Sequence, residues 1–557
     1  VEPQAADVLV RRCARLPLAL RVAAEIVRAR PGLPVGELAG ELAGRPDALD
    51  VLDVHDDPHT AVRAVFSWSY QRLDPDSAKV FRLLGLHHGH DVDLHAVAAM
   101  ADTAPRETRR ALDVLHRAHL VDRSPHGRYR SHDLLRAYAA ELAHATDTDA
   151  DRAAALARLS HHYLAAASAA MDVIAPHETR RRPEVTQPDT IAFHGYDTAL
   201  RWLDRERANL LATTLHGGPE HVIKVSDTIW RYLSIGGYHD DAIALHTRAL
   251  HAAQNLGLEA AEANARRVLG AAALRVGLSA HAIDHLDRAL ALYERTGDHS
   301  LQAATLNNIG VAHWRQGDLH RAADRFRDAL ALYERTGDRR MRAPATNNHA
   351  RILHTLGRHD EALELFTQAL AISRDNGNRT SEANALCGLA DVHAEQGDHQ
   401  RTLDHATEAL TVARETGHRT LEGTAMRLIG IAHRGTGHHH QAVDHLDAAL
   451  RIARSVGDTD QLLSALNALA TTHARTGNPT EALRLHEEAL TVDTTSGHQD
   501  EHAKALVGIA DIHATLANHH EATAHYRRAL ALYRRLGMPQ AATVAATLAD
   551  RTAPATP

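Results

Sequence analysis

Histidine has the widest chemical capacity of the residue types in this chain, and 45 of the 557 residues are histidine. Imidazole binds metal ions and titrates near neutral pH. Five of these histidines are spaced by multiples of 40 residues, namely His313, His393, His433, His473 and His513. Three others are consecutive, namely His438, His439 and His440. Tetrahedral zinc needs four ligand atoms at about 2.0–2.3 Å, whereas side chains at one position of a repeat are held a helix pair apart. We therefore expect these histidines to pack rather than bind a metal, and to make the stability pH-sensitive.

No other set of residues predicts catalysis. Cys13 and Cys387 are the only cysteines, and their separation fits neither a disulfide framework nor a zinc motif, but does fit a reducing cytoplasm. The sequence contains no Gly-x-x-x-x-Gly-Lys-Ser/Thr, so nothing is expected to cradle nucleotide β- and γ-phosphates. Nucleophile–base pairs, paired acids and metal motifs are also lacking. We predict that the chain is not an enzyme and has no catalytic or metal-binding residues.

The composition places the chain among water-soluble helical proteins. The net charge of −8 is spread along the sequence, which argues against wholesale nucleic-acid binding. No run of 18 apolar residues occurs, so we expect no membrane segment and a cytoplasmic location. The first residues, Val1, Glu2 and Pro3, lack both an initiator methionine and a signal-peptide pattern, so we expect a fragment or a processed chain.

The elements that must position any site follow from a strict repeat. Ala-Leu recurs every 40 residues, and a glycine follows each occurrence by eight residues. A second glycine series lies midway, with Ala517 in its last place. The dipeptides begin at 249, 289, 329, 369, 409, 449, 489 and 529. Between glycines the apolar residues recur at steps of three and four, as at Ala322, Phe326 and Ala329, which predicts two helices per unit. A lone helix pair cannot bury both faces, so the units are expected to stack into a solenoid.

The repeat resembles a known family. The order Gly310, His313, Ala322, Phe326, Ala329 is similar to the tetratricopeptide repeat consensus, with the period lengthened to 40, over about 220–550. The resemblance implies an all-α fold built as a right-handed superhelix of 40-residue repeats. It also implies a concave groove, lined by the first helix of each pair, that binds a protein or peptide.

By register, the candidate partner-binding residues of that groove are polar. Asn amides can pair with an extended peptide backbone, and Arg can clamp carboxylates. An alternative left open is a solvated helix face on which Asn bridges neighbouring repeats. The stacked Asn pairs at 307/308 and 347/348 are the preferred contacts. The full set is Asn264, Arg267, Asn307, Asn308, Trp314, Arg315, Asn347, Asn348, Arg351, Asn384, Asp391, Arg427, Arg434 and Asn467.

The N-terminal third predicts a winged helix. Its expected helices are 61–73, 76–86, 94–101, 106–119 and 132–143, and its short hairpin has strands 120–123 and 127–131. The fold class is therefore all-α with a small winged-helix β-hairpin. Arginines on helix 106–119 would suit phosphate contacts, but nearby acids offset them, so direct DNA binding by this part is the weaker interpretation.

Two short motifs resemble those of an NB-ARC (STAND) nucleotide-switch module. Leu16-Pro17-Leu18-Ala19 looks like its Gly-Leu-Pro-Leu motif, and Ser131-His132-Asp133 looks like its Met-His-Asp motif. The surrounding sequence resembles the large actinomycete antibiotic regulators of the AfsR/SARP type. The resemblance implies that Pro17 contacts adenine and His132 reaches the ADP phosphate. It implies ADP or ATP with magnesium for a full-length parent and no cofactor held by this chain alone.

These inferences give a domain plan. We expect a helical remnant of the NB-ARC module at 1–50, a winged helix at 51–145 and a helical linker at 146–218. About eight helix pairs follow at 219–550, with a tail at 551–557. Within the linker, Arg180, Arg181 and Arg182 are expected to form a solvated patch on a loop.

Two functions remain open. The first is the regulatory and sensor portion of a STAND-type regulator of secondary-metabolism transcription. Its groove would bind a protein or peptide, or the parent's own switch module. It would reach DNA only through an upstream domain, would not bind membranes and would oligomerise on activation. The second is the sensor of an antiphage or conflict-system STAND protein that recognises a foreign protein.

Overall fold

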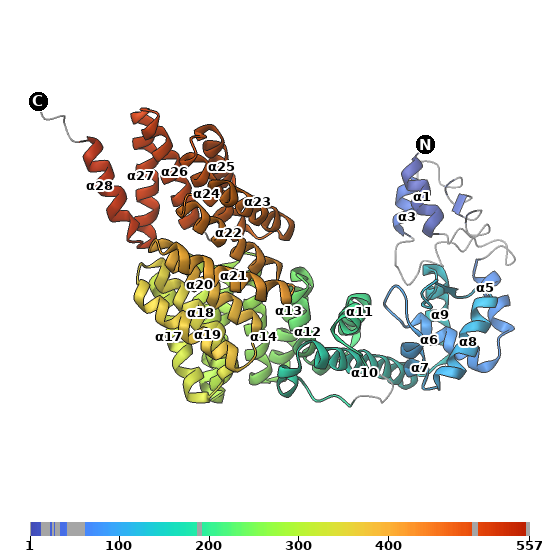
Figure 1. The fold of residues 1–557 in the computed structure, drawn as a ribbon. Coiled ribbons are helices and arrows are strands. Elements are labelled where there is room, and N and C mark those ends of the chain that lie inside the picture. Colours follow the sequence, from blue (N-terminus) through green and yellow to red (C-terminus); the bar gives the residue numbers. More distant parts are fainter. Residues whose placement is uncertain are drawn as a thin grey trace, which may run out of the picture. The chain divides into compact units, whose positions relative to one another are not determined.

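A computed structural model describes residues 2–12, 20, 23–24, 27, 34–41, 62–186, 192–492 and 499–552. The described chain is helical apart from one two-stranded sheet, so the predicted all-α fold class is confirmed. It divides into two compact units, residues 1–258 and 259–557 (Figure 1). None of the described helices combines the length and the apolar character that crossing a bilayer requires.

The first unit contains the predicted helices and hairpin of the N-terminal third. Its early elements are α1 (Pro3–Arg12), α3 (Val35–Glu41), α5 (Val62–Gln71), α6 (Pro75–Gly85), α7 (Leu94–Ala101), α8 (Pro105–Arg117), β1 (Asp122–Arg123), β2 (Tyr129–Arg130) and α9 (Asp133–Thr146). The strands pair antiparallel, with Asp122 opposite Arg130, and are shorter than expected. The aromatic rings of Phe66, Tyr70, Phe81 and Tyr138 form the core between α5, α6 and α9.

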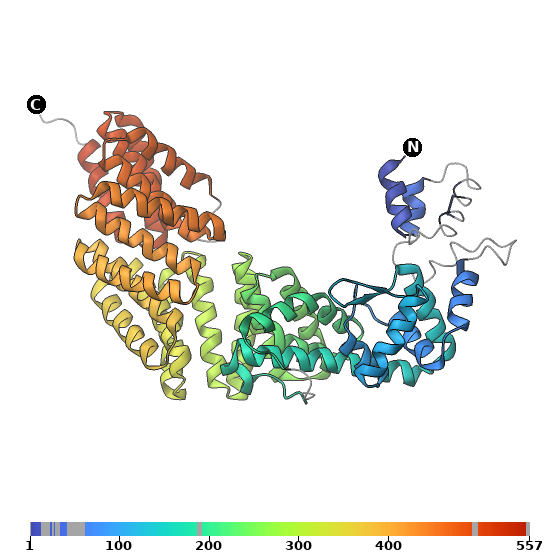
Figure 2. The same ribbon diagram turned by 45° about the vertical axis from the view of Figure 1, so that its right-hand side comes forward.

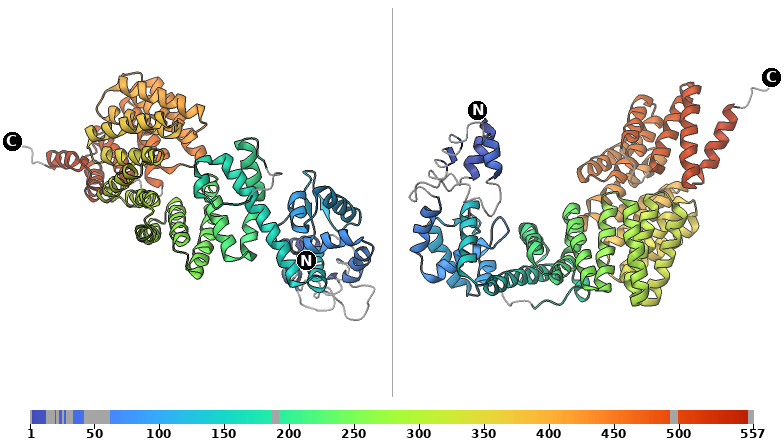
Figure 3. Two further views of the ribbon diagram at one scale, coloured as in Figure 1. Left: turned by 90° about the horizontal axis from the view of Figure 1, so that it is seen from below. Right: turned by 180° about the vertical axis from the view of Figure 1, so that it is seen from behind.

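The rest of the first unit is built around a long helix. The elements are α10 (Asp149–Ile174), the 3₁₀ helix η1 (Pro176–Arg181), α11 (Tyr196–His216), α12 (Pro219–Ile235) and α13 (His239–Leu256), and α10 is the longest of them (Figure 3). A buried ion pair joins the hairpin to α11, since Arg128 Nη2 donates to Glu206 Oε2 at 3.0 Å. Asn209 Nδ2 completes the network, donating to Glu206 Oε2 at 2.7 Å and to the Asp91 carbonyl at 3.0 Å.

The predicted solvated arginine patch is wrong for Arg182. This side chain is buried beside η1, where Nη2 pairs with Asp172 Oδ1 at 2.5 Å and Nη1 donates to the Ala175 carbonyl at 3.0 Å. The guanidinium therefore closes the C-terminal end of α10 instead of facing water. Sequence position alone could not reveal this, because a charge run says nothing about which carbonyls lie within reach.

The second unit consists of stacked helix pairs followed by one last helix. The first helices of the pairs are α14 (Glu259–Arg275), α16 (His299–Arg315), α18 (Arg339–Thr355), α20 (Arg379–Glu395), α22 (Arg419–Gly435), α24 (Thr459–Arg475) and α26 (Gln499–Thr515). The second helices are α15 (Ser279–Thr296), α17 (Leu319–Thr336), α19 (His359–Asp375), α21 (His399–Glu415), α23 (His439–Val456), α25 (Pro479–Thr491) and α27 (His519–Leu536), and the chain ends in α28 (Gln540–Thr552). Figure 2 shows the pairs following one another in sequence order.

Each turn of the solenoid uses the glycines seen in the sequence. At several turns the side chain of the residue after the turn glycine caps the next helix, as Asp318 does by accepting from the Arg321 amide at 3.2 Å. Glycine is favoured before it because the backbone there has positive φ. Ala517 takes this conformation with φ of 60°, at the one turn where the series lacks glycine. Such a conformation costs a residue with a β-carbon on the order of 1 kcal/mol.

The interior of several pairs interlocks a small residue with a bulky one. A β-carbon added to Gly310 would lie 2.8 Å from Cε1 of Phe326, and one added to Gly430 would lie 2.7 Å from Cγ of Leu446. Both bulky side chains are fully buried. The two helices of a pair can approach closely only because these glycines have no side chain.

The end of the second unit packs back onto its earlier pairs. Leu536 and Met538 belong to the same buried cluster as Leu319 and Phe326. A β-carbon on Gly317 would lie 2.7 Å from Cδ2 of Leu536. The superhelix therefore returns on itself within this unit.

Candidate functional site

The inner side of the second unit carries a polar cavity of about 260 Å³. Its walls come from the first helices α16, α18, α20, α22, α24 and α26, as the sequence predicted for a groove. On α20 the lining residues Asn384, Cys387, Asp391 and Glu395 follow steps of three and four, so they form one stripe along the helix. We call this cavity the groove.

Five of the fourteen predicted partner-binding residues line the groove: Trp314, Arg351, Asn384, Asp391 and Arg427. The Arg351 guanidinium lies 5.6 Å from the Trp314 ring centroid, a cation–π contact between neighbouring pairs. The Asn384 amide donates to the Thr380 carbonyl one turn earlier, at 3.1 Å.

Six others bridge neighbouring pairs, which is the alternative that the sequence left open. Asn347 Nδ2 donates to the Ser381 carbonyl at 3.0 Å, and Asn348 donates to Asn307 Oδ1 at 3.2 Å. Arg315 and Arg434 donate to the carbonyls of Leu274 and Ala468 on adjacent first helices, at 2.5 and 3.2 Å. The sixth, Asn467, has the fullest set of partners. Its Nδ2 donates to the carbonyl and to Oε2 of Glu501, at 3.0 and 2.8 Å, and His486 Nδ1 donates to its Oδ1 at 3.0 Å.

The remaining three residues lie elsewhere on the first helices. Arg267 donates to Asn264 within α14 at 2.7 Å, and Asn308 is half-buried on α16. A role in ligand contact stays a prediction for all fourteen residues. For Asn347 and Asn467, which are buried, such contact would require the pairs to separate.

The groove is dominated by carboxylates. Asp391, Glu395, Asp458, Asp460, Asp500 and Glu501 line it, against the cations Arg351, Arg427 and Lys504. Arg427 Nη2 lies 3.5 Å from Asp391 Oδ1. Burial raises the pKa of Asp391, but the positive charges around it, Arg427 foremost with Lys504 and Arg351, together outweigh burial and hold the pKa below its usual value. The groove therefore carries an excess of negative charge when histidine is neutral.

The chain's own C-terminal segment covers part of the groove. Met538, two residues before α28, and Gln540, the first residue of that helix, are among the lining residues. The Gln540 side-chain oxygen is buried without a hydrogen-bond partner. Buried polar atoms are normally paired, so this oxygen is available to a donor that enters the groove.

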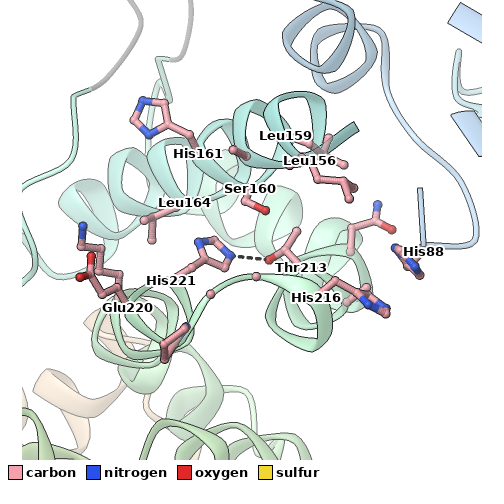
Figure 4. A pocket seen from close by; sticks show the side chains of 18 of the residues that line it. His88, Leu156, Leu159, Ser160, His161, Leu164, Thr213, His216, Glu220 and His221 are labelled. Carbon is pink, nitrogen blue, oxygen red and sulfur yellow. Dashed lines mark hydrogen bonds between the residues drawn. The ribbon is translucent and has the colours of Figure 1, made fainter. Parts of the chain in front are cut away.

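The first unit contains a second cavity, of about 630 Å³ (Figure 4). Leu156, Leu159 and Ser160 of α10 face Thr213 and His216 of α11 across it, and His88 closes one end. The His88 and His216 rings stack with centroids 3.6 Å apart.

Three of the histidines that line this second cavity have a lowered pKa. Burial lowers the pKa of His87, His88 and His221 to about 4, so these imidazoles are uncharged at neutral pH. The His221 Nε2 atom lies 2.9 Å from the Thr213 hydroxyl, the contact dashed in Figure 4. A mostly apolar wall with neutral imidazoles suits a small uncharged molecule with hydrogen-bonding groups. Sequence reasoning did not predict this cavity, because its walls come from segments far apart in the chain.

The predicted nucleotide contacts are only partly described. Pro17 lies outside the described residues. His132 is the residue before α9, half-buried, and its side chain does not cap that helix. With one member of the pair described, nucleotide binding stays a prediction, and no step below depends on it.

Comparison with known proteins identifies the repeats. Residues 263–335, 341–415, 381–455, 421–495 and 460–535 match the tetratricopeptide repeat family. The regulatory protein AfsR of Streptomyces coelicolor is 35% identical over 300 residues, which is 52% of this chain and 30% of that protein. AfsR of Streptomyces griseus is 35% identical over 277 residues, covering 48% and 28%. This chain contains tetratricopeptide repeats and is similar to the AfsR regulators over about half of its length.

The fold of this chain is similar to that of a solved structure. That structure is a STAND protein (signal transduction ATPase with numerous domains) with a tetratricopeptide repeat sensor, from Pyrococcus horikoshii. The TM-score is 0.54 at 14% identity, covering 95% of this chain and 74% of that one. The likeness concerns the fold alone. The chain spans less than a third of the length of the two AfsR proteins.

Sequence reasoning missed several residues of the tetratricopeptide groove. Asp460, Asp500 and Lys504 line it, and so does His354, which lies one position from the recurrent histidines. The sequence did contain a signal for them. Each of these four residues is charged or titratable at a position where most of the other repeats have a small or apolar residue. No pattern near Met538 in the sequence could predict that this residue lines the groove, because the helices beside it are far away in the chain.

Proposed function

We propose that this chain is the regulatory and sensor portion of a STAND-type transcription regulator, and that its groove holds a segment of a partner protein or of the parent's own switch module. The observation that carries the proposal is the convergence of six first helices on one polar cavity. Tetratricopeptide repeats form a scaffold for protein interaction, and the AfsR relatives are regulatory proteins. The similarity to the AfsR regulators supports this regulatory function over that of an antiphage sensor.

The chemistry of the groove favours a positively charged segment. Carboxylates outnumber cations along its wall, and like charges brought opposite each other would repel an acidic ligand. The Asn384 amide and the free oxygen of Gln540 can pair with the backbone of an extended peptide. A basic peptide would therefore satisfy both the charge and the hydrogen-bonding groups of the groove.

Photocrosslinking tests this proposal in cells. A photoreactive amino acid replaces Thr424, which lines the groove, and in a control it replaces Thr411, which is exposed on α21. We expect a specific adduct from position 424 only. A crosslink to another protein identifies a partner, whereas a crosslink within one polypeptide identifies the switch module.

The affinity of the captured segment then tests the role of charge. We expect Asp460→Asn with Asp500→Asn to weaken its binding at least about tenfold, since two opposite charges are lost at the groove wall. Unchanged binding by this double variant, or adducts of equal yield from 424 and 411, would refute the proposal.

We propose that the regulator controls the transcription of biosynthetic genes and acts in the cytoplasm. It would contact DNA through another domain of the parent protein. We propose that release of the groove leads to nucleotide exchange and oligomerisation. Deleting the gene should change transcripts of a biosynthetic cluster and leave phage plating unchanged. The opposite pattern would favour the antiphage function.

A further inference from the structure

One group of side chains at the edge of the groove has the composition of a metal site. His354 at the end of α18, His359 at the start of α19 and Glu395 at the end of α20 each offer a ligand atom, and these atoms lie within 4.8 Å of one another. Among the described residues this is the single group of three or more potential ligands that meets this criterion. The three residues come from three successive helices, so the tertiary fold brings them together.

The distances are close to those of a bound ion. The two histidine Nδ1 atoms are 3.3 Å apart, and the Nε2 atoms of both rings lie 3.8 Å from Glu395 Oε2. Tetrahedral zinc with bonds of about 2.0–2.1 Å separates its ligand atoms by roughly 3.3–3.4 Å. Rotation of the imidazoles about their Cβ–Cγ bonds, with a small shift of the carboxylate, would bring one nitrogen of each ring and Oε2 onto a shared ion.

The three side chains are partly accessible to solvent and lie beside a further carboxylate. The His354 side chain is only 10% exposed, whereas His359 and Glu395 are 32% and 43% exposed, so an ion could enter from solvent. Asp391, one turn before Glu395, has Oδ2 4.0 Å from His354 Nε2. Its carboxylate adds negative charge beside the group, although Arg427 lies on its other side.

The repeat does not generate this arrangement elsewhere. One repeat later, the equivalent positions hold Ala394, His399 and Gly435. His399 lies directly over Gly435, where an added β-carbon would be 2.2 Å from its Cε1 atom. The same register therefore supplies a packed histidine in one repeat and a histidine–carboxylate cluster in the other.

We propose that His354, His359 and Glu395 bind a divalent transition metal of the zinc type at the edge of the groove. Two imidazoles and a carboxylate match the ligand preference of zinc and leave a fourth position for water or a partner's side chain. Such an ion would tie α18, α19 and α20 together and add positive charge to an acidic wall. The proposal does not depend on the identity of any protein partner.

Titration calorimetry with zinc chloride on the metal-stripped, tag-free protein tests the proposal, and cobalt absorption reports ligation directly. We expect one zinc ion per chain. His354→Ala and Glu395→Gln should each weaken binding by more than the roughly 10–100-fold that loss of an outer-shell partner costs. Zinc should also raise the melting temperature of the wild type and not that of Glu395→Gln.

A matched control separates this site from the many other histidines. His399→Ala, in the register of His359, should bind zinc like the wild type. Glu395→Gln preserves side-chain shape at a partly exposed position, so it should fold even if His354→Ala does not. Absence of stoichiometric binding, or equal binding by Glu395→Gln and the wild type, would overturn the proposal.

Discussion

The first helix of each pair has two faces that follow different rules. On the face toward its own second helix, Gly270, Gly310 and Gly430 share one register, each with a bulky side chain packed over it. On the inner face, a single register holds Arg267, Asn307, Asn347, Cys387, Arg427, Asn467 and Val507. The first face is conserved in chemistry from repeat to repeat within this chain, whereas the second changes at almost every step.

The difference teaches where stability and specificity reside. Interlocked helices tolerate few substitutions, because interiors are close-packed and both helices must match. The inner face is constrained only where a side chain also bridges to the next pair, as Asn467 does. Elsewhere it can vary without breaking the solenoid, so we expect recognition to depend on it.

The largest expected effect is at the interlocked face. Phe326→Ala should lower the free energy of unfolding by about 3–5 kcal/mol, because it empties a fully buried site opposite Gly310. Arg327→Ala, exposed on the same helix, should change it by less than about 0.5 kcal/mol. Urea unfolding followed by circular dichroism measures both. Equal effects of the two substitutions would contradict the distinction between the faces.

A pH effect is expected where histidine replaces an aromatic or leucine in the interlock. Burial lowers the pKa of His486 to about 4, whereas an unfolded chain keeps it near 6.5. The unfolded state therefore binds the proton more readily between these values. Stability is fully present above pH 6.5 and is lost as the pH falls toward 4, by about 2 kcal/mol at pH 5.

The substitution His486→Phe tests this assignment. Phe366 packs over Gly388 in the same register as His486 over Gly508, so the phenyl ring should fit. The variant should lose about 2 kcal/mol less than the wild type between pH 7 and pH 5. His440→Ala, at an exposed histidine, should follow the wild-type pH dependence. Thermal unfolding at several pH values distinguishes these outcomes.

Bridging residues should have intermediate effects. Asn467→Ala should cost about 1–3 kcal/mol, because it removes the Asn467 amide from Glu501 Oε2, from the Glu501 carbonyl and from His486 Nδ1, all of which are buried. Asn347→Ala should cost about 1 kcal/mol, since among the described residues its amide makes one hydrogen bond, to the Ser381 carbonyl, and its own oxygen is unpaired. Urea unfolding of the two variants gives the order directly, and a reversed order would contradict the hydrogen-bond accounting.

The smallest effect on stability is expected in the groove itself. Asp460→Asn should change the free energy of unfolding by less than about 0.5 kcal/mol, because this half-buried side chain lies at the cavity wall and not between packed helices. Calorimetric unfolding measures the change. A loss comparable to that of Phe326→Ala would show that the groove face is also structural.

The sequence determined the repeats because their signal is local. A period of 40, a glycine at each turn and an apolar stripe on each helix fix the helix pairs, whatever lies next to them. The helices near 62–71, 75–85, 94–101 and 105–117 were likewise predicted from periodicity and turns. The register of the first helices was a weaker guide, since five of the fourteen residues that it placed in the groove line the cavity.

Tertiary structure alone decided which polar residues meet. The sequence could not separate Arg427, which faces the groove, from Asn467, which bridges two pairs, because both occupy the same register. Nor could it show that Met538 covers the groove or that Glu395 meets His354. A helix fixes the direction of a side chain relative to its own axis, but its partners depend on how far neighbouring pairs rotate, and that rotation is the sum of many packing contacts along the solenoid.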